Sequence, residues 1–392
     1  MTVFTSLQRR AAHFMFASAC YLMTAQNLEA QPPAPLSSTF TATDKGTRAA
    51  MLPTLYANSH AANLLVRKNG DVLCFWFSGT HEGDSNVAIV VSRLPKGTNR
   101  WEPAVLVDRE PGKSYQNPVP YEDPKGRIWL WHTSQTAGKG QADSQVLKVF
   151  SDDGGNIWSK QEVLFQKAGS YLRQPTVVGE NGDLLLPIYY STSEGITKGA
   201  ETNYSAVQVS KDFGKTWKEC LVPKSDGMVQ MNIVKLKQKS YVAFYRSRFA
   251  DHIYRSTSTD GCSWTAPQAT VLPSNNASIQ AFLLKSGQLV MTFDNTRGKS
   301  EEHKTQTGPR APLSIALSPD AGITWNAVRD LELPDAPTAK PEGREEYSYP
   351  SVLQMPDGNI LTAYTFRRLA IKAVLVSEPW IKGGTTVGVY KP

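Results

Sequence analysis

Residues whose side chains can do acid–base or nucleophilic chemistry stand beside short apolar runs throughout this sequence. Tyr349 begins the run "SYPSVLQMPDGNILTAYTF" at 348–366, and Glu82 lies in the tight segment "GTHEG". Tyrosine, histidine and carboxylate side chains can transfer protons or attack carbon, while arginine offers a planar, permanently charged fork that suits a carboxylate. The candidates in such places are His60, Glu82, Asn117, His132, Arg173, Tyr189, Tyr190, Arg246, Asp294, Tyr349, Tyr364 and Arg367.

A repeated sequence element provides the frame that could collect these residues. The pattern Ser-x-Asp-x-Gly-x-x-Trp occurs at 151–158, 210–217 and 318–325, and 258–264 is the same pattern with one residue deleted. Weaker echoes at 92–101 and 377–380 lack the aspartate. The closing tryptophans are separated by 57, 59, 47, 61 and 55 residues. A period of this length indicates a repeat architecture.

Each repeat also contains a hairpin of apolar strands around a turn, and helix signals are poor. Several short strands per period, repeated six times, predict an all-β fold, a six-bladed β-propeller over residues 50–392. In the repeated turn, aspartate caps amides, glycine takes a conformation costly to other residues, and tryptophan packs beneath. We therefore expect these aspartates to be structural. Inner-strand ends of a propeller gather around its axis at one face, where sites form.

The first thirty residues differ from the rest. Arg9 and Arg10 precede the 15-residue apolar stretch "AAHFMFASACYLMTA", and Ala25 and Ala30 offer small residues for cleavage. This order is typical of a secretory signal peptide, so we expect residues 1–30 to direct export to the periplasm or the medium. Lipoprotein-type cleavage before Cys20 is an alternative. No second segment has the length of a membrane span.

Composition narrows the classes of partner. The net charge of +7 and pI of about 9.0 suit an anionic partner, but the basic residues are scattered, which argues against nucleic acid. Cys74, Cys220 and Cys262 form no disulfide framework or metal signature, and pairing of Cys220 with Cys262 stays open. No phosphate-binding loop appears. We expect no cofactor, no metal and a monomer that binds an acidic carbohydrate.

The repeated turns resemble Asp-box (BNR) repeats, and six of them in this arrangement resemble the sialidase (neuraminidase) superfamily over roughly residues 50–390. The resemblance implies three arginines that bind a sugar carboxylate, a Tyr–Glu pair that attacks, and an aspartate as acid/base. A neutral tyrosine hydroxyl approaches a carbon that bears a carboxylate with less repulsion than another carboxylate would. Such tyrosine nucleophiles are a recognised exception among glycosidases.

Three positions match the family pattern. Tyr349 precedes Gly358 by nine residues, as the family nucleophile precedes its turn glycine. Arg246 in "SYVAFYRSR" and Arg310 in "GPRAPLSIALSPD" match the second and third arginines. We expect Arg173, His132, Tyr190 and Arg367 to bind substrate as well. Arg367 and Arg368 are adjacent, so at most one of them faces the axis.

Three positions depart from the pattern. His60 stands where the first arginine is expected, and Gln230 stands where the carboxylate partner of the tyrosine is expected. A neutral amide cannot take a proton from tyrosine. The acid/base role falls on Glu82 or Asp84, of which Glu82 lies in the tighter loop.

These residues leave three functional hypotheses. The first is an exported sialidase-like glycoside hydrolase that acts on a terminal acidic sugar. The second is a polysaccharide lyase on a uronate-containing glycan, for which a base, an acid and an arginine are needed. The third is a glycan-binding propeller without activity.

Overall fold

The computed structural model describes residues 37–192, 199–237, 239–299, 306–336 and 343–392. They belong to one compact unit, residues 32–392. The expected signal segment, residues 1–30, lies outside the described residues, as does Cys20. In the part of the chain that is described, no helix combines the length and the apolar character that a membrane span requires.

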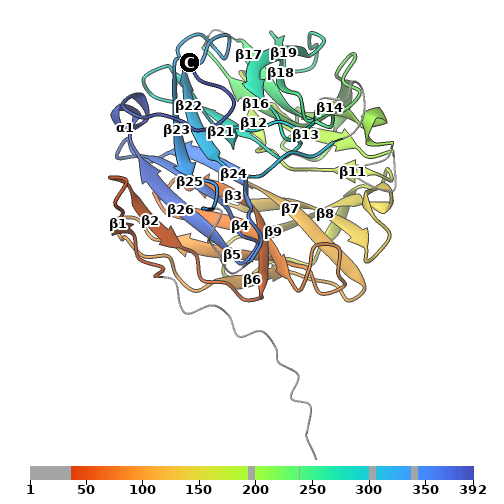
Figure 1. Cartoon of the computed structure of the whole chain (residues 1–392). Helices are drawn as coiled ribbons and strands as arrows, with labels where there is room; N and C mark the ends of the chain where they lie inside the picture. The colour runs from red at the N-terminus through yellow and green to blue at the C-terminus, as the bar shows by residue number, and fades with distance from the viewer. Residues whose placement is uncertain (1–36, 193–198, 238, 300–305, 337–342) are drawn as a thin grey trace, which may run out of the picture. The chain divides into compact units, whose positions relative to one another are not determined.

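Six antiparallel sheets form a six-bladed β-propeller, as the repeats predict (Figure 1). The first two sheets are β3 (Asn58–Val66), β4 (Val72–Gly79), β5 (Ala88–Leu94), β6 (Val105–Asp108), and β7 (Lys113–Glu122), β8 (Ile128–Thr136), β9 (Gln145–Ser151), β10 (Glu162–Phe165). The third is β11 (Ser170–Tyr171), β12 (Val177–Val178), β13 (Leu184–Tyr190), β14 (Tyr204–Ser210), β15 (Lys218–Leu221). The fourth is β16 (Met228–Lys235), β17 (Tyr241–Ser247), β18 (His252–Ser258), β19 (Gln268–Pro273). The fifth is β20 (Gln280–Leu283), β21 (Leu289–Asp294), β22 (Leu313–Ser318), β23 (Ala327–Glu332).

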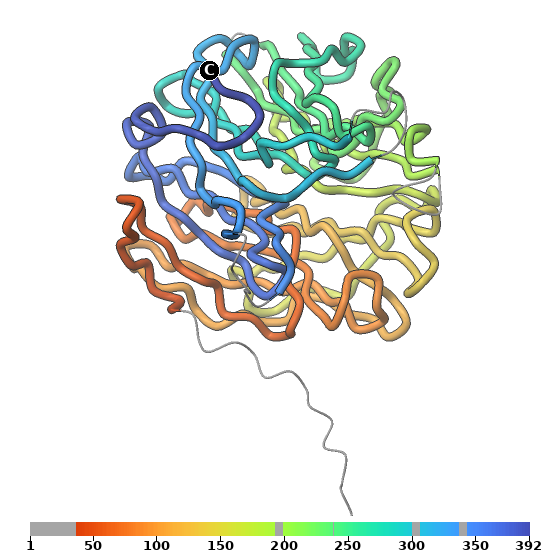
Figure 2. The backbone as a smooth tube through the Cα atoms, viewed as in Figure 1, coloured from red at the N-terminus to blue at the C-terminus, as the bar shows by residue number. Residues whose placement is uncertain are grey.

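The sixth blade combines both ends of the described chain. It contains β24 (Tyr347–Gln354), β25 (Ile360–Phe366) and β26 (Ala370–Val376), and it continues with β2 (Arg48–Met51) and β1 (Thr41–Ala42). Figure 2 shows the red N-terminal strands beside the blue C-terminal ones, in agreement with the pairing of Arg48 with Leu375. The inner strand β24 also packs on β3, which closes the ring. Propeller strands therefore begin before residue 50, where the sequence placed the start.

The repeated turns are structural, as expected. In 151–158, the carboxylate of Asp153 accepts hydrogen bonds from the amides of Asn156 and Ile157, both at 3.0 Å, and the Trp158 indole donates to the carbonyl of Gly155 at 3.2 Å. The turns at 210–217 and 258–264 repeat this arrangement, and the turn at 318–325 repeats the aspartate bonds to the backbone amides. The echo at 377–380 instead begins a short helix, α1 (Glu378–Lys382), which Ser377 caps.

A bulge near the axial end of the inner strands turns selected side chains. The first bulged residue has a positive φ angle, which non-glycine residues rarely adopt. The ladder register shifts at this point in β3, β7, β16 and β24. The positive-φ residues at or just before the inner strands of five blades are Ala61, Asn117, Gln230, Asn276 and Tyr349. Three of them are candidates from the sequence, and such strained positions concentrate at functional sites.

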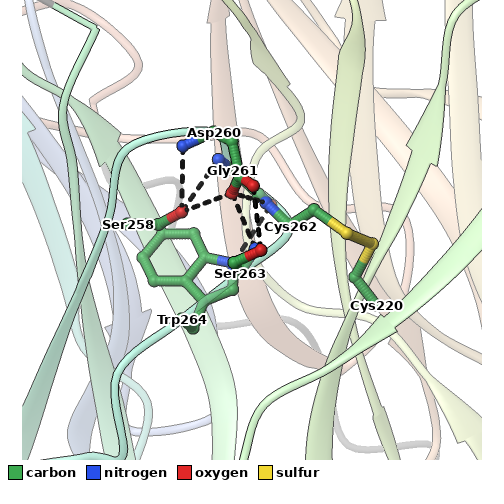
Figure 3. Close-up of a disulfide and its surroundings, with 7 residues drawn as sticks. All are labelled: Cys220, Ser258, Asp260, Gly261, Cys262, Ser263 and Trp264. Atoms are coloured by element: carbon green, nitrogen blue, oxygen red, sulfur yellow. Dashed lines mark hydrogen bonds between the residues drawn. A yellow bond between two sulfur atoms is a disulfide. The ribbon is translucent and has the colours of Figure 1, made fainter.

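A disulfide joins two neighbouring blades. Cys220 on β15 bonds to Cys262 in the turn at 258–264 across a separation of 42 residues (Figure 3). The sequence left this pairing open, because two cysteines in different repeats say nothing by themselves about the distance between them. Cys74 is buried and unpaired, as expected for a small apolar side chain.

We expect the Cys220→Ala/Cys262→Ala double variant to be less stable than the wild type by about 4 kcal/mol, from the loop-closure entropy of a crosslink of this span. Urea unfolding of oxidised protein measures the difference. A reducing agent should lower the stability of the wild type and leave the double variant unchanged. Equal stability of the wild type with and without reductant would contradict the prediction.

Candidate active site

Tyr349 lies at the centre of a cationic cluster on the propeller axis. The guanidinium carbons of Arg173, Arg246 and Arg310 lie 5.5, 5.6 and 5.5 Å from the centroid of its ring. The ring centroid of His60 is 4.2 Å away. Nη1 of Arg246 donates to the Tyr349 hydroxyl at 2.5 Å. Four blades thus contribute side chains to one tyrosine, which is 9% exposed.

Arg246 and Arg310 reach the tyrosine from the fourth and fifth blades. Arg246 is the last residue but one of β17, and its Nε donates to the Asn276 side chain at 2.7 Å. Arg310 precedes β22; it is ion-paired with Glu346 and donates to the Ser348 hydroxyl at 3.3 Å. Both guanidinium groups are therefore oriented by a second bond, which prepares them to bind an anion.

Arg173 is oriented differently from the other two. Its guanidinium donates to the carbonyls of Ala62 at 3.1 Å, Tyr349 at 3.0 Å and Pro350 at 2.9 Å, and to the Ser278 hydroxyl at 3.0 Å. All three of its nitrogens are engaged with inner strands of the first, fifth and sixth blades. The sequence suggested a substrate-binding role for Arg173, but the side chain instead fixes the strained backbone at Tyr349.

Arg368 extends the cluster toward solvent. Its Nε lies 3.0 Å from Oε1 of Glu346, and its Nη1 donates to Oε2 of Glu82 at 2.7 Å. Arg367 and Arg368 both have positive φ and form the turn between β25 and β26. A turn with two such residues favours asparagine and glycine, so two arginines there are strained. The Arg368 and Glu82 side chains remain 14% and 39% exposed.

Glu346 is the buried counter-charge of this arrangement. Its carboxylate is ion-paired with Arg310 and Arg368 and accepts a hydrogen bond from Ser348 at 2.8 Å. Burial alone would raise its pKa, but the charges of Arg310 and Arg368 outweigh burial and lower the pKa of Glu346 to about 2. The carboxylate therefore stays ionised at any physiological pH.

His60 is a neutral neighbour of Tyr349. The ring is fully buried, and burial first, then the charges of Arg368 and Arg310, lower the pKa of His60 well below its ordinary value. Nδ1 is hydrogen-bonded to the Thr365 hydroxyl at 2.8 Å, and Nε2 has no hydrogen-bond partner among the described residues. His60 therefore cannot replace the cation that the family resemblance implies at this position.

Among the described residues, neither Gln230 nor Asp84 is bonded to the hydroxyl of Tyr349. Oε1 of Gln230 is buried without a hydrogen-bond partner in this part of the chain, and the hydroxyl of Tyr349 is bonded to Arg246 instead. Asp84 accepts from Thr80 at 2.5 Å within its own loop. Of the two acid/base candidates, Glu82 is the one ion-paired with the axial cluster.

Three expected substrate-binding residues have their partners away from Tyr349. His132 lies 2.8 Å from Asp108 and packs on Tyr115. The hydroxyl of Tyr190 is bonded to Glu219. Arg367 is ion-paired with Asp335, whereas its neighbour Arg368 joins the cluster. Position on a strand does not reveal how far a side chain lies from the axis, which explains these differences.

The environment of Tyr349 favours its ionised form. Burial alone would raise the pKa of the hydroxyl, but the charges of Arg246 and Arg310 outweigh burial and lower the pKa below its ordinary value. At Tyr189, by contrast, burial outweighs the charge of the nearby Arg248 and raises the pKa to about 12. A tyrosine that ionises easily beside anion-binding arginines can act as a nucleophile or as a base.

Two arginines of this region escaped the sequence analysis as site residues. The sequence offers Arg368 only as the alternative to Arg367. Arg248 follows Arg246 by two residues, and its side chain is fully buried between the second, third and fourth blades. Residues two apart in a strand share a face, so the position of Arg248 two residues after Arg246 could have indicated that both belong to this region.

Comparison with known proteins agrees with this architecture. Residues 70–361 match the model of the BNR repeat-like domain, and the chain belongs to this family. No curated protein matches the sequence. The NanB sialidase from Streptococcus pneumoniae is similar in structure, with 14% identity, a TM-score of 0.67, and coverage of 89% of this chain and 71% of that chain.

Two further solved structures are similar over nearly their whole length. The intramolecular trans-sialidase from Ruminococcus gnavus, in complex with oseltamivir carboxylate, has 14% identity and a TM-score of 0.65, covering 86% of this chain and 96% of that chain. A protein of unknown function from Dyadobacter fermentans has 16% identity and a TM-score of 0.65, covering 83% and 97%. At such identities the likeness establishes a sialidase-like fold.

We expect Glu346→Gln to destabilise the protein near pH 7, because two buried guanidinium groups lose their counter-charge. The ionised carboxylate contributes stability above its unfolded pKa of about 4.5, and this contribution is lost as pH falls toward 2. A shift of this size corresponds to roughly 3 kcal/mol. Urea unfolding between pH 7 and 3 should show the gap between variant and wild type narrowing.

The matched control is Glu345→Gln, which alters the exposed neighbouring carboxylate. This variant should run parallel to the wild type across the same pH range. A gap for Glu346→Gln that stays constant with pH would contradict the assigned ionisation.

Proposed function

We propose that this protein is a sialidase-like glycoside hydrolase that acts on a terminal acidic sugar of a glycan. The observation that carries the proposal is the Tyr349 hydroxyl, bonded to Arg246 at 2.5 Å with Arg310 beside the same ring. A tyrosine held by cations suits attack on a carbon whose substituent is a carboxylate. The family and the fold of its structural neighbours support the class.

The substrate carboxylate would bind to Arg246, Arg310 and Arg368. Arg310 and Arg368 share Glu346 on one side and keep partial exposure on the other, with side chains 12% and 14% exposed. Arg368, from the last blade, would thus supply the third cation in place of His60. Planar guanidinium groups bind carboxylates with two parallel hydrogen bonds, which fixes the orientation of the sugar.

In the first step, the oxygen of Tyr349 would form a bond to the anomeric carbon while the glycosidic C–O bond breaks. Glu82 would give its proton to the leaving oxygen. In the second step, Glu82 would take a proton from water, whose oxygen attacks the anomeric carbon and releases Tyr349. Because Arg246 and Arg310 stabilise the phenolate, the hydroxyl proton of Tyr349 would pass to solvent before the attack, and Gln230 need not act as a base; the second step releases Tyr349 as the phenolate again.

A substrate carboxylate that binds Arg368 would compete with Glu82 for the same guanidinium, because Nη1 of Arg368 donates to Oε2 of Glu82 at 2.7 Å. Binding would therefore release the Glu82 side chain from this contact and leave it free to turn toward the leaving oxygen.

The proposal includes export, with residues 1–30 as the signal peptide. The Cys220–Cys262 disulfide supports it, because such bonds persist in oxidising compartments and are rare in the cytosol.

We expect Tyr349→Phe to lower kcat on an acidic glycoside by at least about a thousandfold, because the nucleophile is removed. Binding of the free sugar acid should persist, since the arginines remain. Release of reducing sugar and isothermal titration calorimetry measure the two properties. The control is Tyr364→Phe, in the same blade as Tyr349, whose hydroxyl is bonded to Glu332 of the fifth blade; it should keep wild-type turnover. Retained turnover in Tyr349→Phe would refute the assigned role.

We also expect Tyr349 to ionise at a lower pH than an ordinary tyrosine, whose pKa is about 10. Ultraviolet difference titration of the wild type against Tyr349→Phe isolates this group. Arg246→Met should move the transition upward, because a neighbouring cation is lost. Ionisation of Tyr349 together with the other tyrosines above pH 10 would be the contrary result.

A lyase is the second candidate, and Gln230 is the observation that favours it. Without a carboxylate partner, the phenolate of Tyr349 could remove the proton next to an arginine-bound uronate carboxylate, and the leaving oxygen would take a proton from Glu82. The product would then contain a carbon–carbon double bond conjugated to the carboxylate. Ultraviolet absorbance of the products distinguishes the two reactions, because hydrolysis yields reducing ends without it.

A further inference from the structure

Arg248 is a buried cation that the proposed reaction does not use. The residue follows β17 and is 0% exposed. Its Nη2 donates to the side chain of Gln141 at 3.2 Å, and its guanidinium lies 5.8 Å from the centroid of the Tyr189 ring. Nε and Nη1 are buried and have no hydrogen-bond partner among the described residues.

Leaving these donors unpaired is costly. A buried polar group without a partner costs about 1–3 kcal/mol, and a charged group costs more. Most buried polar groups are therefore paired, and exceptions require an explanation. Desolvation lowers the pKa of Arg248 to about 10, which still leaves it charged at neutral pH. A charged fork with two free N–H groups is suited to an anionic oxygen ligand.

The charge balance of the axial site also indicates an anionic ligand. Arg173, Arg246, Arg248, Arg310 and Arg368 bring five guanidinium groups to the region. Among the described residues, the facing carboxylates are Glu82 and Glu346; burial raises the pKa of Asp294 to about 8, so that carboxyl is mostly neutral at pH 7. Five positive and two negative charges leave an excess of three, which one carboxylate cannot balance.

Arg246 and Arg248 point to different sides of the axis. Arg246 is bonded to Asn276 before the fifth blade and to Tyr349 in the sixth. Arg248 is bonded to Gln141, in the turn η1 (Gln141–Asp143) of the second blade, and faces Tyr189 of the third. Anionic groups bound by the two arginines would therefore lie on opposite sides of one ligand.

The inner strands of the second and fourth blades also offer unpaired acceptors. Oε1 of Gln230 and Oδ1 of Asn117 are buried without a partner among the described residues, and both residues are at inner-strand bulges. Acceptors of this kind suit sugar hydroxyls. Donors and acceptors left open together match a ligand that carries both an anionic group and hydroxyls.

We propose that Arg248 binds a second anionic group of the substrate, so that the site takes a glycan end bearing two acidic groups. The second group is a sulfate ester or another carboxylate, since both present oxygens to a guanidinium fork. This inference rests on the proposed function, because Arg246, Arg310 and Arg368 hold the first carboxylate. Arg248 is a specificity residue and takes no part in bond making.

Calorimetry with inorganic sulfate tests the Arg248 site without any assumption about turnover. The wild type should bind sulfate, and Arg248→Met should bind it about ten- to a hundredfold more weakly, as expected for a charge-assisted hydrogen bond. The matched control is Arg100→Met, which removes an exposed arginine outside the axial site; it should bind sulfate like the wild type. Equal binding by Arg248→Met and the wild type would overturn the inference.

Paired sugar acids then identify the second group. Methyl glucuronide is compared with its sulfate ester, and galactonate with galactarate. The wild type should favour the member with two charges by about tenfold or more, and Arg248→Met should lose this preference while still binding the singly charged member. The preferred pair distinguishes sulfate from carboxylate. No preference in the wild type would overturn the inference, whereas binding of no sugar acid at all would count against the proposed function.

Gln141→Ala provides a second variant in case Arg248→Met does not fold. Gln141 is partly exposed and bonds only the far nitrogen of Arg248 among its contacts to the site. Its loss should weaken sulfate binding severalfold by releasing the guanidinium. Unchanged sulfate binding in this variant would also speak against the arrangement.

Discussion

The excess of buried positive charge around Tyr349 is the constraint on which the site depends. Guanidinium groups are expensive to remove from water, and they persist only where fixed acceptors compensate them. Arg173 is compensated by carbonyls of inner strands, and Arg310 and Arg368 share Glu346. Arg246 is bonded to the neutral side chain of Asn276, and its Nη1 donates to the tyrosine hydroxyl. The lowered pKa of Tyr349 is a direct consequence.

The propeller supplies this arrangement through a repeated local distortion. Inner-strand bulges with positive φ aim side chains such as Tyr349 and Gln230 at the axis, and they strain the backbone. Arg173 stabilises this strained backbone by donating hydrogen bonds to the carbonyls of Tyr349 and Pro350. The repeated Asp-box turns and the Cys220–Cys262 disulfide stabilise the outer parts of the blades. The stable propeller can then hold a site whose strained backbone and buried guanidinium groups cost free energy of folding.

The sequence predicted the fold well because its repeats are periodic and their turns have specific chemistry. It also brought Tyr349, Arg246 and Arg310 into one predicted site, and the structure places these three side chains together; their distances from turn glycines and Asp boxes are fixed by the blade. The sequence prediction was wrong where the outcome depended on the direction in which a side chain points. The positive φ angles at Arg367 and Arg368 decide which arginine faces the axis, and the burial of His132 and Tyr190 against partners in the blades depends on packing between strands. Neither property leaves a periodic trace in the sequence.

The central claim is that Tyr349 attacks the anomeric carbon of an acidic sugar. Mass spectrometry of the intact protein, quenched during turnover of an acidic glycoside and followed by peptide mapping, tests it most directly. The account predicts an adduct with the mass of one glycosyl unit on the peptide that contains Tyr349. Turnover without an adduct, or with an adduct on a different residue, would contradict it.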